Sequence, residues 1–451
     1  MSGNLTIAEL ESAIAAEEID TVVVAFADAQ GRLVGKRVSA RFFQEVVLPH
    51  GAEACNYLLS VDVDMNTVDG YAMSSWDTGY GDMMLLPDPA TLRRIPWLPG
   101  SALVMADLQW ESGDPVVQSP RDILGRQRAR LADRGLIAYS GTELEFIVFD
   151  DTYRDAWARG YRNLTPSTDY NVDYDLLASG RLEPLLRDIR QSMDSAGLFC
   201  EGVKGECNLG QQEIAFRFAE VLETADQHVI YKNGAKSIAG NHGKALTFMA
   251  KFNEREGNSC HIHLSVRDDA GVPVMAGDGE HGFSPLMGSW IAGILATLRE
   301  FTLLYAPNIN SYKRFAKGSF APTGIAWGVD NRTCALRVIG HGSSLRVENR
   351  VPGGDVNPYL GIAAIIAGGL YGIENDLPLP DPLAGNAYTS GVDQLPTTLR
   401  EAAQLFSESA IARAAFGDEM VDHYLNQARI EVEAYDAAVT DWERVRGFER
   451  L

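Results

Sequence analysis

Two glutamates stand close together in a segment that otherwise has the pattern of a buried strand. In the run GTELEFIVF, residues 141–149, alternation along a strand places Glu143 and Glu145 on one face with Ile147 and Phe149. Two like charges about 7 Å apart on a half-buried face repel each other and cost desolvation unless a cation neutralises them. The pair therefore indicates a metal site or, if the strand lies at a sheet edge, a solvated acidic face.

Two further segments carry groups that bind metal ions. Glu206 and Glu213 lie on either side of a glycine-containing turn in KGECNLGQQEIAFRF, and Glu213 begins a strand face that also carries Arg217. His261 and His263 alternate in CHIHLSV, so they point to the same side of another strand. A single strand histidine is most often a packed core residue, whereas a pair on one face makes anion or metal contact an equal alternative.

A fourth segment, and the stretch before it, is rich in basic residues. In SSLRVENRVPG, Arg346, Glu348 and Arg350 share one strand face, which taken alone also fits a salt-bridge ladder in solvent. Acidic residues outnumber basic ones 61 to 39 in the chain, so concentrated arginine indicates recognition of phosphate or carboxylate, which guanidinium binds bidentately. The preceding segments SYKRFAKG and NRTCALRV add Lys313, Arg314, Arg332 and Arg337.

Together the four segments predict one site for phosphoryl transfer. Their five carboxylates and one or two imidazoles suit two hard divalent cations, Mg²⁺ or Mn²⁺, whereas zinc would favour more cysteine and histidine. Arginines beside two metals fit a reaction in which both stabilise charge on the transferred phosphoryl group. The chain has neither a GxxxxGK[ST] loop nor a suitably placed GxGxxG, so the nucleotide would bind without a P-loop or Rossmann turn.

The composition excludes several classes of protein. The 451-residue chain is 46% hydrophobic, enough for a large core, and its formal net charge of −22 argues against binding to nucleic acid or to an anionic membrane surface. Its five scattered cysteines form no CxxC pair, and no apolar run is long enough for a membrane span. A cytoplasmic location fits best, and we expect Cys207 and Cys260 to be packing residues that point away from the metal-binding face.

The order of the elements predicts an α+β protein of two domains. We expect a small domain over residues 1–112, whose first helix is capped by Thr6 and Glu9, and a larger domain over residues 113–451, whose first helix begins at Pro120. All the candidate metal ligands belong to the larger domain. The small domain is expected to contain a helix over 7–19, a hairpin turning at 28–31, a helix over 40–47 and a strand over 101–110.

The same segments resemble the glutamine synthetase family. The motifs that carry the resemblance are ELEF, GECNLGQQE, CHIH, NSYKR, DNRT and RVENRVPGGDVNPYL, and it runs from the N-terminal hairpin to TDWER near the C-terminus. It implies a β-grasp N-terminal domain and a larger catalytic domain with a curved antiparallel sheet and surrounding helices. It also implies a ring-shaped homo-oligomer, such as a dodecamer, in which a neighbour's N-terminal domain completes each active site.

The resemblance also implies a role for each candidate residue. The family activates the γ-carboxylate of glutamate with ATP, and an amine then captures the acyl phosphate. One metal would be bound by Glu145, Glu206 and Glu213, and the other by Glu143, His261 and Glu348. The nucleotide phosphates would face His263, Arg332, Arg337 and Arg346, and glutamate would bind Arg314, Arg350 and Gly257. Of these, Arg332 and Arg350 would act in catalysis.

Departures from the family pattern concern the amine. Phe320 stands in KRFAKGSFAP where the family carries the acid that covers the ammonium site, and Glu256 begins EGNS where Asn-Gly-Ser-Gly is usual. The DGSS sequence that helps to bind ammonium is absent, and Asp62 and Asp64 are among the few candidates in its region. Ammonium needs anionic groups that bind and deprotonate it, so their loss favours a larger primary amine with binding contacts of its own.

Several alternatives remain for the amine and its base. The stretch NYLLSVDVDMNTVDGY most resembles γ-glutamylethanolamide synthetases, with γ-glutamylpolyamine synthetases next. Glu256, Asp62 and Asp64 are the candidates for the base that deprotonates the amine. An ordinary, ammonium-using glutamine synthetase is the alternative enzyme. A non-catalytic relative is disfavoured, because every candidate metal ligand and phosphate-facing arginine is present.

Overall fold

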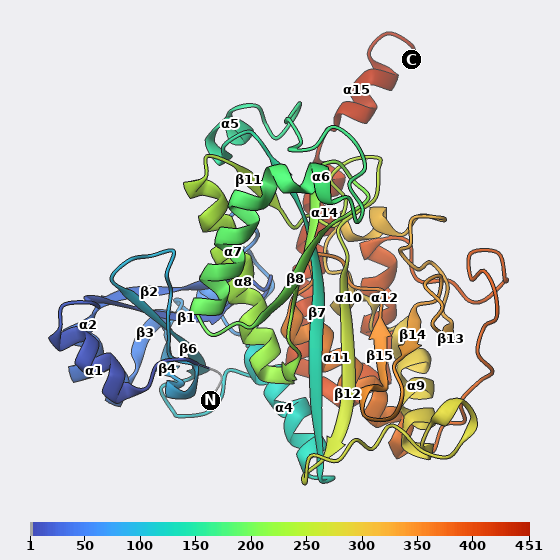
Figure 1. The fold of residues 1–451 in the computed structure, drawn as a ribbon, viewed down its shortest axis with the longest axis horizontal. Coiled ribbons are helices and arrows are strands. Elements are labelled where there is room, and N and C mark those ends of the chain that lie inside the picture. Colours follow the sequence, from blue (N-terminus) through green and yellow to red (C-terminus); the bar gives the residue numbers. More distant parts are fainter. Residues whose placement is uncertain (1–2) are drawn as a thin grey trace.

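The structure, a computed structural model, describes residues 3–451 and contains two β-sheets. The first sheet has six strands in the order β2-β1-β6-β4-β3, with β5 paired to β6. β1 and β6 are parallel neighbours, whereas β1 and β2 form an antiparallel hairpin. This sheet and its helices form the blue lobe on the left of Figure 1. The strands are β1 Thr21–Ala27, β2 Leu33–Ser39, β3 Ala52–Cys55, β4 Asp82–Pro87, β5 Arg93–Arg94 and β6 Ser101–Gln109.

The start of the chain follows the sequence prediction in its helix cap and its turn, although the helix predicted over residues 7–19 already ends at Ala15. Helix α1, Ile7–Ala15, begins with the predicted capping box: Thr6 Oγ1 accepts from the Glu9 amide at 3.2 Å, and a Glu9 carboxylate oxygen accepts from the Thr6 amide at 2.8 Å. The hairpin turns at residues 28–31, where Gly31 has a positive φ of 75° that suits glycine. Strand β6 confirms the prediction of a strand over residues 101–110.

The predicted helix over residues 40–47 is longer and less regular than expected. It consists of α2 Ala40–Phe42, a π-helical turn Phe43–Val47 and α3 Leu48–His50. Within it the Leu48 amide donates to Phe43 O, five residues back, instead of four. Pro49 follows directly and has no amide to donate, so the ordinary helical pattern cannot continue through this turn.

The second sheet has nine strands and holds the candidate site. Its order is β13-β14-β15-β12-β7-β9-β8, with β10 and β11 also paired to β7. The long strand β7, Leu136–Phe149, pairs antiparallel with β12 and β9, and is drawn in teal at the centre of Figure 1. The others are β8 Cys200–Gly205, β9 Gln211–Phe216, β10 Ala219–Glu220, β11 Ala245–Thr247, β12 Cys260–Asp268, β13 Trp327–Val329, β14 Leu336–Ile339 and β15 Arg346–Asn349. With its helices, this mixed architecture confirms the α+β fold class.

Helices pack around the second sheet, and the most buried of them is α11. It contacts α4, α8 and α9, and it approaches α9 so closely that a Cβ on Gly372 would lie 1.9 Å from Ser289 O. Although α11 is apolar, it could not cross a membrane, and no other helix within residues 3–451 is long and apolar enough to do so. The helices are α4 Pro120–Ala132, α5 Tyr153–Ala158, α6 Leu176–Ser179, α7 Glu183–Ser195, α8 Val221–Asn241, α9 Pro285–Leu298, α10 Thr302–Tyr305, α11 Pro358–Glu374, α12 Leu399–Glu408, α13 Ala410–Phe416, α14 Asp418–Ala437 and α15 Asp441–Gly447.

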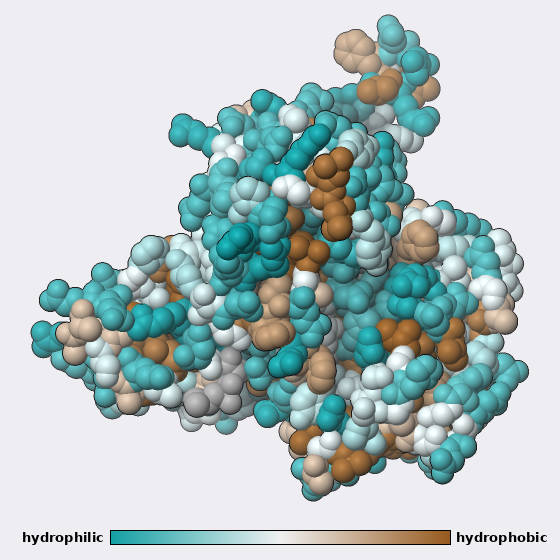
Figure 2. All heavy atoms as spheres, in the orientation of Figure 1, coloured by the Kyte–Doolittle hydropathy of each residue, from teal (hydrophilic) through white to brown (hydrophobic). Residues whose placement is uncertain are grey.

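Exposed apolar side chains on the face that Figure 2 shows include those of α6 and α15. Brown surface lies over α6, where Leu176 and Leu177 are exposed, and on α15, which projects from the body of the molecule in Figure 1. The exposed apolar side chains at α15 include Trp442, Val445 and Phe448. A projecting helix with such side chains is the kind of surface that a partner covers.

One buried arginine connects the two sheets. Arg121, on α4, is 4% exposed; its guanidinium lies 3.0 Å from an Asp226 carboxylate oxygen on α8 and 2.8 Å from one of Asp88, beside β4. It also pairs with Asp107 on β6. The Tyr359 hydroxyl on α11 donates to Asp226 at 2.6 Å and so extends the network. A single cation therefore pairs with three carboxylates, two from the region of the first sheet and one from α8.

We predict that replacing this cation destabilises the whole chain. In Arg121→Met the buried Asp226 loses its charge partner, and breaking a buried ion pair from one side typically costs about 3–5 kcal/mol. Denaturant unfolding should show that loss. The matched control is Arg128→Met on the same helix, whose half-exposed pair with Glu220 should be worth about 0–1 kcal/mol. Equal stabilities for the two variants would contradict the connecting role of Arg121.

Candidate active site

The first predicted metal-ligand group comes together where β7, β8 and β9 meet. Glu145 on β7 is the direct cross-strand partner of Glu213 on β9, and Glu206 follows β8. One carboxylate oxygen from each of the three lies within 4.8 Å of the others. Alternation and strand pairing therefore bring together three carboxylates that are far apart in the sequence.

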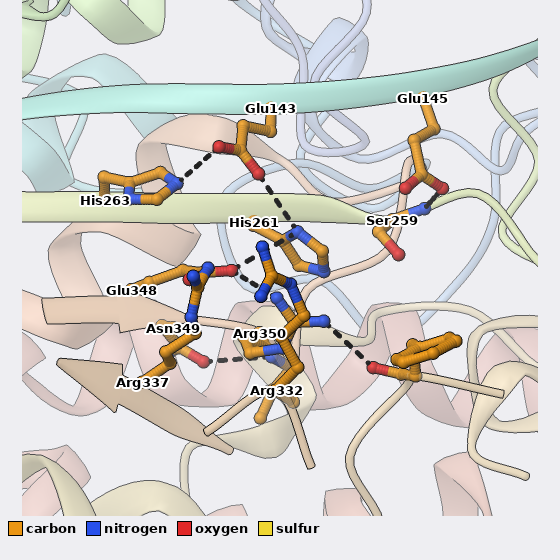
Figure 3. Close-up of polar contacts among 12 residues, drawn as sticks. Glu143, Glu145, Ser259, His261, His263, Arg332, Arg337, Glu348, Asn349 and Arg350 are labelled. Carbon is orange, nitrogen blue, oxygen red and sulfur yellow. Dashed lines mark hydrogen bonds and ion pairs between the residues drawn. The ribbon is translucent and has the colours of Figure 1, made fainter. Parts of the chain in front are cut away.

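The second group lies beside it, across β7, β12 and β15. His261 pairs with Glu143 across the sheet, and His263 pairs with Glu348. His261 Nδ1 is 3.3 Å from one Glu143 oxygen and 3.5 Å from a Glu348 oxygen, while His263 Nε2 is 2.9 Å from the other Glu143 oxygen. Figure 3 shows Glu143 between the two imidazoles. His263, expected to face the nucleotide, thus also lies within 4.8 Å of Glu143 and Glu348.

Basic side chains compensate the carboxylates of this second group. Glu348 is fully buried, with Arg337 Nη1 at 2.8 Å and Arg350 paired to its other oxygen. Burial alone would raise the pKa of Glu348, but His261 and Arg350 lower it. The pKa of Glu143 is likewise lowered, because hydrogen bonds from the two histidines outweigh its burial. Burial, aided by Arg350, lowers the pKa of His261 to about 4, so its imidazole is neutral and able to bind a metal.

The first group has too few cations to balance its carboxylates. Burial, together with Glu206, raises the pKa of Glu145 to about 8. Burial and the neighbouring carboxylates raise the pKa of Glu213 to about 9. Glu145 still accepts hydrogen bonds from the Ser259 amide at 2.7 Å and from Gln211 Nε2 at 3.0 Å. Glu206 pairs with Lys204, so the charge left uncompensated is that of Glu145 and Glu213. A hard divalent cation fits these carboxylates and would take the place of their protons.

Two cavities meet at these carboxylates. The first, of about 320 Å³, holds the first ligand group, and the second, of about 460 Å³, runs along β7 and β12 beside Phe218. Among residues 3–451, Glu143 is the one lining residue that both cavities share. The first cavity contains the predicted residues Glu256, Gly257, Phe320, Arg332, Arg337 and Arg350, and the second contains His263 and Arg346.

Four predicted residues do not line these cavities. One is Glu348, which is fully buried behind Arg337 and Arg350. Arg314 is buried and its guanidinium donates to Val351 O at 2.8 Å and to Ser259 Oγ at 2.9 Å, so in this structure it supports the cavity wall. Asp62 and Asp64 lie in the loop between β3 and β4, where Asp62 accepts from the Asp64 amide at 2.9 Å. They lie outside both cavities of their own chain.

The first cavity also contains residues that the sequence analysis did not single out. Asp173 and Tyr174 come from the irregular segment before α6, and Lys204 comes from β8. Lys204 precedes Glu206 by two residues, so the alternation rule could have placed it on the same side. Cys207 also lines this cavity, so the expectation that it points away was wrong. Burial raises the pKa of its thiol to about 11, which keeps it protonated and a poor nucleophile.

Comparison with known proteins shows the family to which the chain belongs. The family model described as the glutamine synthetase catalytic domain matches residues 117–446. The chain belongs to the glutamine synthetase family. It is an ATP-dependent ligase that forms a carbon–nitrogen bond, in the branch of the family that makes amides of glutamate with amines.

Particular relatives are similar along nearly the whole chain. The chain is 63% identical over 447 residues to the γ-glutamylethanolamide synthetase GlnA4 of Streptomyces coelicolor, covering 99% of this chain and 96% of that protein. It is 38% identical over 434 residues to a glutamate–isopropylamine ligase of a Pseudomonas species, covering 95% of each. The solved structure of a GmaS/ADP complex matches with a TM-score of 0.86 and 29% identity, covering 98% of this chain and 99% of that one.

We predict that divalent cations bind more tightly as the pH rises. With pKa values of about 8 and 9, Glu145 and Glu213 carry protons at neutral pH that a cation must displace. Affinity for Mn²⁺ should therefore rise between pH 6.5 and 8, by up to about tenfold per pH unit for each proton released. Calorimetric titration in buffers of different ionisation enthalpy measures both the affinity and the number of protons.

The control for this titration is Glu145→Gln, which should bind the cation more weakly and release fewer protons. Because raised carboxyl pKa values favour the folded state only while the groups are protonated, the metal-free protein should also lose stability as the pH rises from about 4.5 through 8 to 9. An affinity for Mn²⁺ that does not change between pH 6.5 and 8 would contradict the assignment of this group.

Proposed function

We propose that this chain joins the γ-carboxylate of glutamate to ethanolamine through a γ-glutamyl phosphate, with ATP as the phosphoryl donor. The observation that carries the proposal is the 63% identity, over almost the full length of both chains, to a protein named γ-glutamylethanolamide synthetase. The departures at Phe320 and Glu256 support an organic amine over ammonium. A polyamine is the second candidate amine, since an acidic cavity suits any cationic amine.

The proposal assigns ATP and glutamate to different cavities. ATP would occupy the second cavity, with its phosphates directed past His263 and Arg346 toward Glu143. Glutamate would occupy the first cavity, with Gly257 and Arg350 among its contacts and Arg314 behind them. The γ-phosphoryl group would then cross at the carboxylates, where Arg332 and Arg337 lie in the wall of the first cavity.

Enzymes of this family use ATP and divalent metals, and we propose Mg²⁺ or Mn²⁺ at two places here. Glu145, Glu206 and Glu213 would hold one ion; Glu143, Glu348 and His261 or His263 would hold the other. When bound, such ions neutralise the phosphate oxygens and stabilise charge on the transferred group. The arginines that now compensate Glu348 would then be available to the substrates' own anionic groups.

The amine must lose a proton before it attacks the acyl phosphate. Glu256 lines the first cavity and is the candidate base within this chain. Asp62 and Asp64 remain candidates only if the N-terminal region of a second copy reaches this cavity, as it would in a ring. The exposed apolar side chains on α15 support such an assembly, for which a dodecamer is the proposed size.

The two sheets support a matching division of the chain into domains. We propose an N-terminal β-grasp domain over residues 1–112 and a catalytic domain over residues 113–451. Separate hydrophobic clusters support it: one is built from the first sheet and α1, whereas the larger one is formed mainly by the second sheet and its helices. The parallel pairing of β1 with β6 is compatible with a β-grasp arrangement.

We predict that Arg332 stabilises the phosphoryl group during transfer. Its side chain is half-exposed at the first cavity, with its nearest carboxylate, Asp330, 4.0 Å away, so it is free to turn toward a substrate. Loss of one such contact typically lowers turnover by about 10²-fold or more, and Lys lacks the planar fork that would replace it. Steady-state kcat of Arg332→Lys measures this loss.

The control for that variant is Arg299→Lys, a half-exposed arginine on the surface, paired to Glu401 outside both cavities. It should keep the kcat of the wild-type enzyme. An unchanged kcat in Arg332→Lys as well would remove Arg332 from the chemistry.

The experiment that tests the proposed function is an amine panel. The protein is incubated with ATP, Mg²⁺ and glutamate, and then with ethanolamine, isopropylamine, putrescine, spermine or ammonium, while phosphate release and product mass are followed. We expect the highest kcat/KM with ethanolamine and the lowest with ammonium. Higher kcat/KM with ammonium than with any organic amine would restore an ordinary glutamine synthetase, and a maximum with putrescine or spermine would favour the polyamine alternative.

A further inference from the structure

The corner of the first cavity formed by Asp173, Tyr174 and Glu206 holds the ammonium group of Lys204. Its Nζ lies 3.2 Å from Asp173 Oδ1 and 3.3 Å from Gly205 O, and it also pairs with a Glu206 carboxylate oxygen. The Tyr174 ring covers it, with its centroid 4.4 Å from Nζ. Lysine has three N–H donors, and each meets an oxygen acceptor while the cation faces an aromatic ring.

These partners are what a free ammonium ion would need. Two carboxylates, a carbonyl oxygen and an aromatic face supply hydrogen bonds and charge on the scale of a single nitrogen. The corner belongs to the cavity that contains Glu145 and Glu213, so a nitrogen bound there would lie beside the proposed chemistry.

We propose that Lys204 is a specificity-determining residue that excludes free ammonium from the active site by filling this corner with its own ammonium group. A second monovalent cation placed beside it would meet like-charge repulsion and find the acceptors already taken. A divalent ion on Glu206 would leave Lys204 its contacts with Asp173, Gly205 O and the Tyr174 ring. The exclusion would therefore persist in the metal-bound enzyme.

This inference rests on the proposed use of an organic amine. Such an amine does not depend on the corner, because its carbon chain and further polar group supply binding contacts elsewhere in the cavity, which also contains Glu256 and Phe320. Ammonium has no such contacts and depends on hydrogen bonds and charge alone. Occupation of one small corner thus acts against the small nucleophile and leaves the larger one unaffected.

The test is a gain of function in the full-length enzyme. In Lys204→Ala the corner keeps Asp173, Tyr174 and Glu206 but loses its cation, so kcat/KM for ammonium should rise by about tenfold or more. Glutamine is measured by mass in the presence of ATP, Mg²⁺ and glutamate. Lys204→Arg retains the positive charge and should keep ammonium excluded. The double variant with Asp173→Asn should lose the gain, because it removes one of the carboxylates that an ammonium ion would use.

Lys244→Ala is the matched control. The side chain of Lys244 is 28% exposed and pairs with Asp150 outside the cavity, whereas that of Lys204 is 24% exposed. The control should not change the use of ammonium. Unchanged glutamine formation in Lys204→Ala would overturn the proposal, and so would a folded Lys204→Ala enzyme that makes no product from any nucleophile, because Lys204 would then act in the chemistry itself.

A second measurement uses the wild-type enzyme and needs no variant. Ammonium chloride, compared with potassium chloride at equal ionic strength, should not compete with ethanolamine for amide formation. Competitive inhibition by ammonium would overturn the proposal even if Lys204→Ala failed to fold. The proposed function is tested separately. A wild-type enzyme that makes no amide from any organic amine would contradict it, whatever the role of Lys204.

Discussion

The active site is organised by the need to balance five carboxylates that strand pairing gathers on one side of a sheet. Glu143, Glu145, Glu206, Glu213 and Glu348 come from three strands and the turn after β8; Glu145 and Glu348 are buried, and the other three are partly buried. Two histidines hold Glu143, two arginines hold Glu348, and Lys204 holds Glu206. Glu145 and Glu213 have no full ion pair of this kind. Their burial and the neighbouring carboxylates therefore raise the pKa values of both carboxyl groups. The charged partners of Glu348 and Glu206 thus compensate part of the negative charge that the proposed divalent cations would also compensate.

Because Arg350 compensates a candidate metal ligand, its contacts would differ between the metal-free and the metal-bound protein. Arg350 pairs with Glu348 and also donates to the Phe320 carbonyl at 3.2 Å, so the guanidinium ties a candidate ligand to the loop that carries Phe320. Phe320 has a positive φ of 59°, which a large side chain adopts only when its surroundings hold it. Metal binding at Glu348 would relieve the arginine of one partner and leave the other. The charge state of the carboxylates and the position of the loop are thus linked through one side chain.

Much of the site could be predicted from the sequence because it lies on strands. Alternation with period two was sufficient to pair Glu143 with Glu145 and His261 with His263, and the structure places each pair on one face. Asp173 and Tyr174 escaped prediction because they lie in an irregular segment whose path no periodicity describes. Lys204 escaped for another reason: a lone lysine on a strand is most often a solvated residue. The burial of Arg314 depends on the packing of distant loops, which residue spacing does not encode.

Much of the N-terminal fold was predictable because its signals lie within a few neighbouring residues. The error in the predicted helix after residue 40 also has a local cause. The capping box and the hairpin turn need only a few neighbouring residues, and both were found where the sequence placed them. The helix after residue 40 ran on past its predicted end because the π-helical turn accommodates Pro49, which the helix rule treats as a stop. The joining of the two sheets through Arg121 depends on carboxylates far apart in sequence, so only the folded chain reveals it.

The sharing of Glu143 by both cavities bears on the kinetic order of the reaction. Since a single carboxylate contributes to both walls, the cavity proposed for ATP and the cavity proposed for glutamate share one lining residue and otherwise have separate linings. If ATP and glutamate occupy separate cavities as proposed, neither has to pass through the cavity of the other. A compulsory order between these two substrates would then arise from charge, through the cations that the carboxylates bind, and not from steric obstruction.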